Sequence, residues 1–161
     1  MPCGIMALST LKPSRLGVKN TCVLLIAMRY IVLDTNCLLQ ALPSKSPYHK
    51  LWTDIMDGKV CLCVNTDILD EYEEIIGQKS TPEIAHNVVE AIANLTTTVL
   101  QTSYVHFELL TTDYDDNKFV DCAIAADAEY IVTNDKDFEP LAQIPWPRVE
   151  IIKLAEFIKQ L

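Results

Sequence analysis

Two aspartates stand where predicted strands end, and carboxylates in such positions can bind a metal ion or a water molecule. Asp34 directly follows the apolar run 30–33, and Asp135 follows the run 130–132 after Thr133 and Asn134. If these strands are parallel, both acids lie beyond the carboxyl ends of the strands, where open α/β sheets form their ligand sites. The alternative role is structural, because an aspartate after a strand often caps the next helix.

A third acid comes from the segment 113–117, Asp-Tyr-Asp-Asp-Asn, which precedes a predicted helix. One of its acids is expected to cap that helix. At about 100° per residue, Asp116 points close to the direction of Phe119 and Ala123, over the sheet edge. Asp121 points well away from them, which predicts an exposed helix charge. The periodicity therefore favours Asp116, with Asp121 as a second-line candidate.

The acidic run 67–74 supplies the fourth candidate. Its apolar stripe predicts a helix that places Asp70 and Glu74 on the solvated side. Glu71 and Glu73 flank the stripe, and either of them can reach inward. Periodicity alone does not choose between these two, and a solvated acidic face is the default for most of such a run.

Four carboxylates brought together without cations raise one another's pKa values and destabilise a fold. Hard oxygen ligands of this kind suit Mg²⁺ or Mn²⁺, which can activate a water for phosphodiester hydrolysis and stabilise the leaving oxygen. The net charge of −9 argues against a nucleic-acid binder that relies on basic patches alone. The charge balance favours a metal enzyme, since divalent ions let an acidic pocket accept an anionic backbone.

The six cysteines show no Cys-x-x-Cys pair, and the three histidines show no metal-binding spacing. We interpret the cysteines as small buried apolar residues of a protein in a reducing, cytoplasmic compartment. Half of the 161 residues are hydrophobic, which supports a real core and argues against disorder.

The apolar runs alternate with helical patterns along the chain. Strands are predicted at 30–33, 60–64, within 97–107, at 130–132 and at 149–152. Helices are predicted around 68–76 with a stop at Gly77, from Ser80-Thr81-Pro82-Glu83 with a capping box onward, around 119–126, and at 154–161. Strands separated by helices imply right-handed crossovers and a parallel sheet, so the fold class is α/β.

Residues 1–28 differ from the rest of the chain, with basic residues, no acid and a short apolar run at 22–28. That run is too short to span a membrane, and it lacks a convincing cleavage site for a signal peptide. We therefore expect an extension, disordered or a start-site artefact, over 1–28 and one domain over 29–161, with no membrane contact.

Four segments, in this order, resemble the PIN-domain family of nucleases: Val-Leu-Asp-Thr-Asn at 32–36, Ile-Leu-Asp-Glu-Tyr at 68–72, Asp-Asn-Lys-Phe at 116–119 with Ala123 following, and Ile-Val-Thr-Asn-Asp at 131–135. Their order and spacing are similar to a VapC-like subgroup of toxins from toxin–antitoxin systems. The resemblance implies a three-layer α/β/α sandwich around a parallel sheet. It also implies cleavage of single-stranded RNA with Mg²⁺ or Mn²⁺, an antitoxin protein as partner, and a homodimer.

The resemblance also implies a role for each site residue. Asp34 and Asp116 would be the core metal ligands, and Glu71 and Asp135 would complete the shell or position a water. Thr35, Asn36 and Thr133 would supply hydrogen bonds around the site, and Asp137 is a further second-line candidate. The resemblance thus selects Glu71 over Glu73.

Two other functions stay open. One is a catalytically silent PIN-like module that only binds a partner or nucleic acid. The other is a different Mg²⁺-dependent phosphohydrolase, although a haloacid-dehalogenase-type site would need a second aspartate where Asn36 stands. With four glycines and no Gly-rich phosphate loop, nucleotide binding of that type is improbable.

Overall fold

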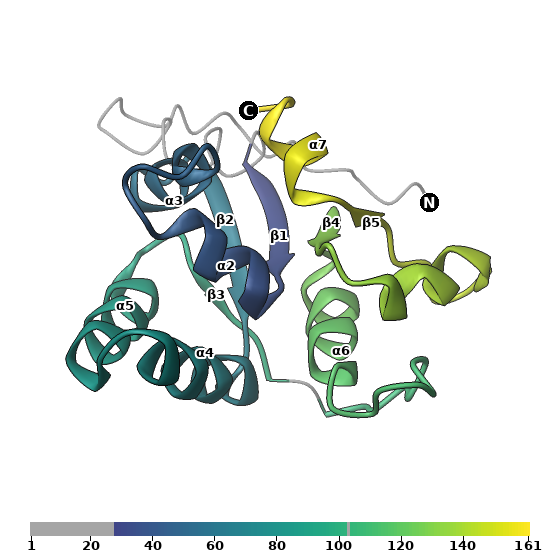
Figure 1. Cartoon of the computed structure of the whole chain (residues 1–161). Helices are drawn as coiled ribbons and strands as arrows, with labels where there is room; N and C mark the ends of the chain where they lie inside the picture. The colour runs from purple at the N-terminus through teal and green to yellow at the C-terminus, as the bar shows by residue number, and fades with distance from the viewer. Residues whose placement is uncertain (1–27, 103) are drawn as a thin grey trace, which may run out of the picture.

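Five short strands form a parallel sheet at the centre of the molecule (Figure 1). The computed structural model describes residues 28–102 and 104–161. The strands are β1 (Arg29–Leu33), β2 (Val60–Val64), β3 (Val99–Leu100), β4 (Tyr130–Val132) and β5 (Ile151–Ile152). They lie in the order β3-β2-β1-β4-β5, and every neighbouring pair is parallel. This confirms the predicted α/β class and the parallel sheet.

Helices surround the sheet in two layers. They are α2 (Thr35–Ala41), α3 (His49–Met56), α4 (Thr66–Lys79), α5 (Pro82–Asn94), α6 (Asn117–Ala126), the 3-10 helix η1 (Lys136–Gln143) and α7 (Leu154–Ile158). The chain adds β2 and β3 to one side of β1 and then returns to add β4 on the other side. Right-handed crossovers therefore place α2 to α5 on one face and α6 on the opposite face, where α6 contacts β1, β2 and β4.

The central strands are the most apolar part of the core. Ile31, Val32 and Leu33 are buried, and so are all five residues of β2. Strands covered on both faces need such continuous apolar runs, which explains why the sequence pattern located them. The strand order reverses between β1 and β4, and open α/β sheets usually bind ligands in the crevice outside the carboxyl ends of the strands at such a point.

The predicted helix boundaries need two corrections. The helix α4 does not stop at Gly77 but continues to Lys79, and the hydroxyl of Ser80 donates to the carbonyl of Ile76. A Cβ on Gly77 would lie 3.7 Å from Ala85 Cβ, an ordinary van der Waals contact, so the approach of α5 does not require a glycine here. No capping box forms at α5, because Thr81 alone caps the helix through the N–H of Ile84.

The sequence pattern predicts no range for three of the helices, α2, α3 and η1. The four described cysteines are buried and free, which confirms their interpretation as small core residues. Within the described chain, no helix has the length and apolar character needed to cross a membrane. The predicted extension at 1–28 lies outside the described residues apart from Met28.

Candidate active site

Asp34 lies at the carboxyl end of β1 and is 7% exposed. Its Oδ1 accepts a hydrogen bond of 3.2 Å from the N–H of Asn36, so it caps α2 as the structural alternative expected. Its Oδ2 accepts a second bond of 3.1 Å from the hydroxyl of Thr133, which follows the neighbouring strand β4. The carboxylate is therefore held in place from two elements, with both oxygens at the crevice between β1 and β4.

Asp135 is connected to Asp34 through Thr133. The Thr133 hydroxyl that donates to Asp34 also accepts the N–H of Asp135 at 3.0 Å. The carboxylate of Asp135 is exposed and caps η1 by accepting the N–H of Asp137 at 2.9 Å. Asp137 is exposed as well. Two acids at the ends of adjacent strands thus contact the same threonine hydroxyl, Asp34 through its carboxylate and Asp135 through its backbone N–H.

Glu71 projects from α4 toward the same crevice. Its Oε1 accepts the hydroxyl of Thr35 at 2.5 Å, and its Oε2 lies 2.5 Å from the ammonium of Lys118. Glu73 is exposed and faces His86 on α5, 3.3 Å from its Nδ1. The packing of α4 therefore distinguishes the two glutamates that periodicity left equivalent.

Two polar residues fix α4 relative to the rest of the site, and sequence reasoning identified neither. Asn65 caps α4 through the N–H of Ile68 at 2.8 Å and donates to the carbonyl of Lys118 in α6 at 3.3 Å. The buried hydroxyl of Tyr72 donates to the carbonyl of Leu33, directly before Asp34. The only sequence signal for Asn65 was an asparagine between a strand and a helix, which is typical of a helix cap.

Asp116 occupies the N-cap position of α6, but its side chain makes no capping hydrogen bond. The preceding loop is held instead by the buried side chain of Asn117. The Asn117 amide accepts the N–H of Leu110 at 2.9 Å and donates to the carbonyls of Leu110 and Tyr114. Asn117 therefore organises the loop, and the carboxylate of Asp116 stays available at the helix start.

The prediction that Asp121 is an exposed helix charge is wrong. Its side chain is 2% exposed and accepts two hydrogen bonds of 3.0 Å, from the N–H of Phe107 and from Nδ1 of His106. The segment before α6 folds back over the helix and covers this position. Helical periodicity does not report such cover, because a loop supplies it.

The electrostatics show how closely the acids gather. Burial raises the pKa of Asp34, against the hydrogen bonds from Asn36 and Thr133, and the charges of Asp135 and Glu71 raise it further. The pKa of Asp116 is raised to about 7. The main cause is burial, followed by the charges of Asp113, Asp34, Asp135 and Glu71. The charges of Asp135 and Glu71 thus raise the pKa values of both Asp34 and Asp116, as expected for carboxylates without a cation between them.

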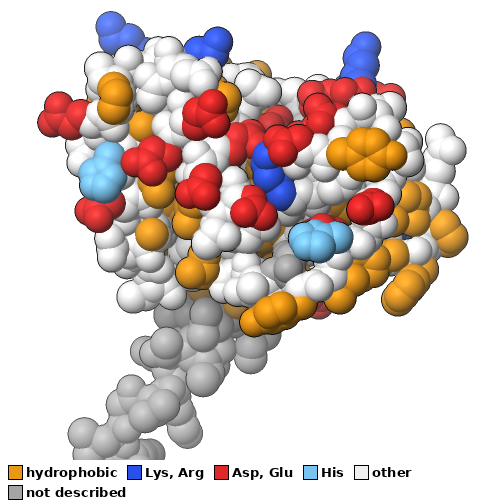
Figure 2. Space-filling model, turned by 90° about the horizontal axis from the view of Figure 1, so that it is seen from below, with side chains coloured by type: hydrophobic (Ala, Val, Ile, Leu, Met, Phe, Trp, Pro, Cys, Tyr) orange, Lys and Arg blue, Asp and Glu red, His pale blue; other side chains and the backbone are white. Residues whose placement is uncertain are grey.

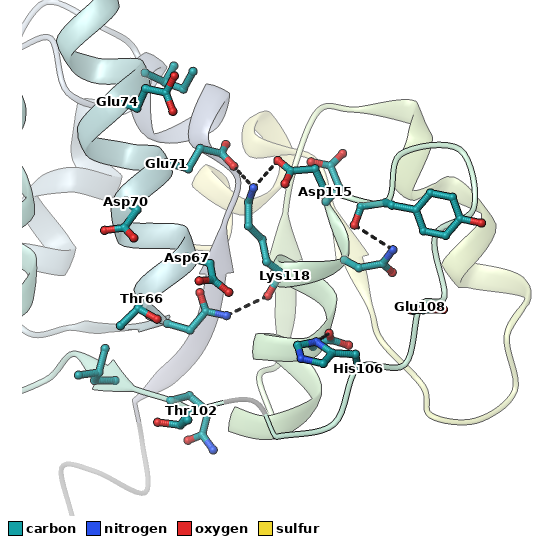
Figure 3. A pocket seen from close by; sticks show the side chains of 18 residues that line it. Thr66, Asp67, Asp70, Glu71, Glu74, Thr102, His106, Glu108, Asp115 and Lys118 are labelled. Atoms are coloured by element: carbon teal, nitrogen blue, oxygen red, sulfur yellow. Dashed lines mark hydrogen bonds and ion pairs between the residues drawn. The ribbon is translucent and has the colours of Figure 1, made fainter.

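A pocket of about 830 Å³ opens beside these acids. Glu71, Asp116 and Asp121 line it, whereas Asp34 and Asp135 are not among its lining residues. Because β1 points toward the bottom of Figure 1, the view from below in Figure 2 looks onto this carboxyl edge, where acidic side chains gather. Figure 3 shows Lys118 between Glu71 and Asp115, with His106 and Thr102 on the opposite wall.

The donor set fits a hard divalent cation. Carboxylate and hydroxyl oxygens are the ligands that Mg²⁺ and Mn²⁺ prefer. The pKa of Asp116 is raised first by burial and then by the negative charges of its neighbours, and a cation would relieve those charges. Asp34, Asp116, Asp135 and Glu71 are the residues able to hold it. As their side chains stand within 28–102 and 104–161, no three His, Cys, Asp or Glu residues form a metal-holding group. Metal binding therefore requires side chains to move.

The raised pKa of Asp116 predicts how pH affects the metal-free protein. An acid whose pKa is higher in the folded state favours folding most when it is protonated, so stability falls as pH rises from about 4 to 7. In EDTA, we expect a higher Tm at pH 5 than at pH 8, measured by circular dichroism. The range from pH 5 to pH 8 excludes the titration of Asp54. Burial raises the pKa of Asp54, but Lys50 and Lys59 lower it by more, so its contribution to stability is lost only at lower pH. Asp116→Asn should flatten the trend, and an equally steep trend in that variant contradicts the assignment.

Comparisons with known proteins agree with this architecture. The sequence profile of the PIN domain matches residues 30–137. The structure of VapBC2 from Rickettsia felis, bound to a DNA fragment from its promoter, is similar over 77% of this chain and 98% of that chain, with 16% identity and a TM-score of 0.54. DNA-bound VapBC from Salmonella typhimurium is similar over 79% and 99%, with 18% identity and a TM-score of 0.52. Comparison with curated proteins found no match. At these identities the two structures establish the shared fold.

Proposed function

This chain belongs to the PIN-domain family of nucleases, and from that membership we propose that it is a metal-dependent endoribonuclease acting on single-stranded RNA. The observation that carries the proposal is the group of four acids at the carboxyl edge of the sheet. Each of Asp34 and Asp116 has a pKa raised by burial and by the charges of its acidic neighbours. Gathered carboxylates destabilise a fold unless a bound cation neutralises them, so such a group is typical of a functional site.

We assign the roles as follows. Asp34 and Asp116 are the main metal ligands, and Glu71 and Asp135 complete the shell or position a water. Bound Mg²⁺ or Mn²⁺ would supply an activated water and stabilise the leaving oxygen of the phosphodiester. The Thr133 hydroxyl keeps Asp34 oriented, and the Thr35 hydroxyl does the same for Glu71. Asn36 is exposed beside Asp34 and can contact the substrate.

We further propose that the protein is the toxin of a toxin–antitoxin pair in the cytoplasm, with an antitoxin protein as its partner and a homodimer as its assembly. The similarity of the fold to two VapBC structures supports the toxin role and the antitoxin partner. Co-expression with candidate antitoxins, followed by size-exclusion chromatography, would test both the antitoxin complex and the homodimer.

The test of the activity is cleavage of a mixed-sequence single-stranded RNA with Mn²⁺ or Mg²⁺. We expect cleavage within the strand that EDTA abolishes and added Mn²⁺ restores, together with a higher Tm in Mn²⁺, because the ion binds only the folded site. A folded protein that neither cleaves RNA nor gains stability from divalent ions would instead be a silent binding module. Turnover of small phosphate esters without RNA cleavage would indicate a phosphohydrolase.

A further inference from the structure

Lys118 is the one lysine or arginine among the described residues that line the pocket. Its side chain is 12% exposed, and its ammonium lies 2.5 Å from Glu71 Oε2 and 2.5 Å from Asp115 Oδ2 (Figure 3). An ammonium carries three N–H donors, so two carboxylate partners leave it able to take a further acceptor. The proposed catalytic acids thus already have a cation of the protein's own beside them.

Lys118 pairs with Glu71 Oε2, an oxygen that a metal ion bound by both oxygens of this carboxylate would use. Glu71 Oε1 accepts the hydroxyl of Thr35, and Glu71 Oε2 faces the ammonium. Both oxygens are therefore engaged, and a divalent ion can use Oε2 only if Lys118 moves away.

The main chain of Lys118 is fixed, whereas its ammonium stands at the end of a flexible four-carbon stem, 5.7 Å from the centroid of the Phe119 ring. The carbonyl of Lys118 accepts the side-chain N–H of Asn65, and the adjacent Phe119 is buried in the core. The second carboxylate, Asp115, is 80% exposed, so its attraction is screened by water. When it leaves Glu71, the ammonium remains beside Asp115 at the pocket, where a phosphate of the substrate can become its next partner.

We propose that Lys118 competes with the divalent metal ion for Glu71 and, once displaced, binds a phosphate of the RNA. The proposal rests on the nuclease function inferred above. It makes Lys118 an exchangeable cation: it neutralises Glu71 in the metal-free protein and turns to the substrate when the metal arrives. A lysine with a purely structural role would behave differently, because its loss would weaken metal binding and folding together.

Isothermal titration with Mn²⁺ tests the competition. Lys118→Met keeps most of the aliphatic stem and removes the ammonium, so Mn²⁺ should bind about three- to tenfold more tightly than to wild type. The matched control is Lys50→Met, which removes a lysine paired with Asp54, a carboxylate that also pairs with Lys59 at the amino end of β2. Lys50→Met should leave Mn²⁺ affinity unchanged. In a Glu71→Gln background, Lys118→Met should change it little. Unchanged or weaker Mn²⁺ binding by Lys118→Met overturns the competition.

The phosphate contact is tested by RNA cleavage at saturating Mn²⁺. Lys118→Met should raise KM for the RNA several-fold, and Lys118→Arg should restore it, because the guanidinium keeps the charge. An unchanged KM in Lys118→Met overturns the phosphate contact. If wild type does not cleave RNA at all, the proposed function fails, and the Mn²⁺ titrations still decide whether Lys118 competes for Glu71.

Discussion

Asp34→Asn is expected to lower kcat/KM for RNA cleavage at saturating Mn²⁺ by at least about 100-fold, because a charged group aimed at the reacting centre is typically worth that much. The fold should persist in this variant. Asparagine can still cap α2, and the Thr133 hydroxyl can accept a bond from the new amide as well as donate one. The substitution also removes the free-energy cost of burying a charged carboxylate, which is the main cause of the raised pKa of Asp34. Circular dichroism and Tm measured beside the cleavage rate separate loss of chemistry from loss of fold.

Neighbouring acids provide the controls for this result. Glu71→Gln should also impair cleavage strongly, whereas Glu73→Gln should cut as wild type does, because Glu73 is exposed and faces His86 instead of the site. Asp70→Asn removes the same charge from the exposed rim of the pocket and should have little effect. Equal cleavage by wild type and Asp34→Asn, or equal loss in Glu71→Gln and Glu73→Gln, would show that the site assignment is wrong.

The sheet was predictable because its physical cause is local. Strands buried on both faces, such as β2, must be apolar throughout, and five such residues in a row are visible in the sequence. Asp34 and Asp135 could be placed for the same reason, since each follows an apolar run and parallel strands end at one edge. Their dual character, as helix caps and as members of an acidic group, was also predictable from position alone.

What the sequence could not provide depends on contacts between distant segments. Glu71 and Glu73 differ because α4 packs beside α2 and α6, which bring Thr35 and Lys118 to Glu71 and not to Glu73. Asp121 was assigned to solvent because helical periodicity does not include the loop that covers it. In each case a tertiary contact overrides a correct local rule.

Asn117→Ala is expected to destabilise the protein by about 3 kcal/mol, because it leaves the buried N–H and the buried carbonyl of Leu110 without partners. Each such loss typically costs about 1–3 kcal/mol, and water reaching the loop offsets part of the total. For a protein of this size, the change corresponds to a drop in Tm of about 10 °C. Urea unfolding followed by circular dichroism measures the free energy directly.

The same substitution should also reduce RNA cleavage below the melting range, since the loop that Asn117 holds leads directly into Asp116. Asn94→Ala is the matched control, because Asn94 makes one hydrogen bond on an exposed helix end, to the carbonyl of Glu90. It should lower stability by less than about 1 kcal/mol and leave cleavage unchanged. If Asn117→Ala loses stability but cuts normally at low temperature, the loop contributes to folding and not to the position of Asp116. The roles of loop and carboxylate would then be independent.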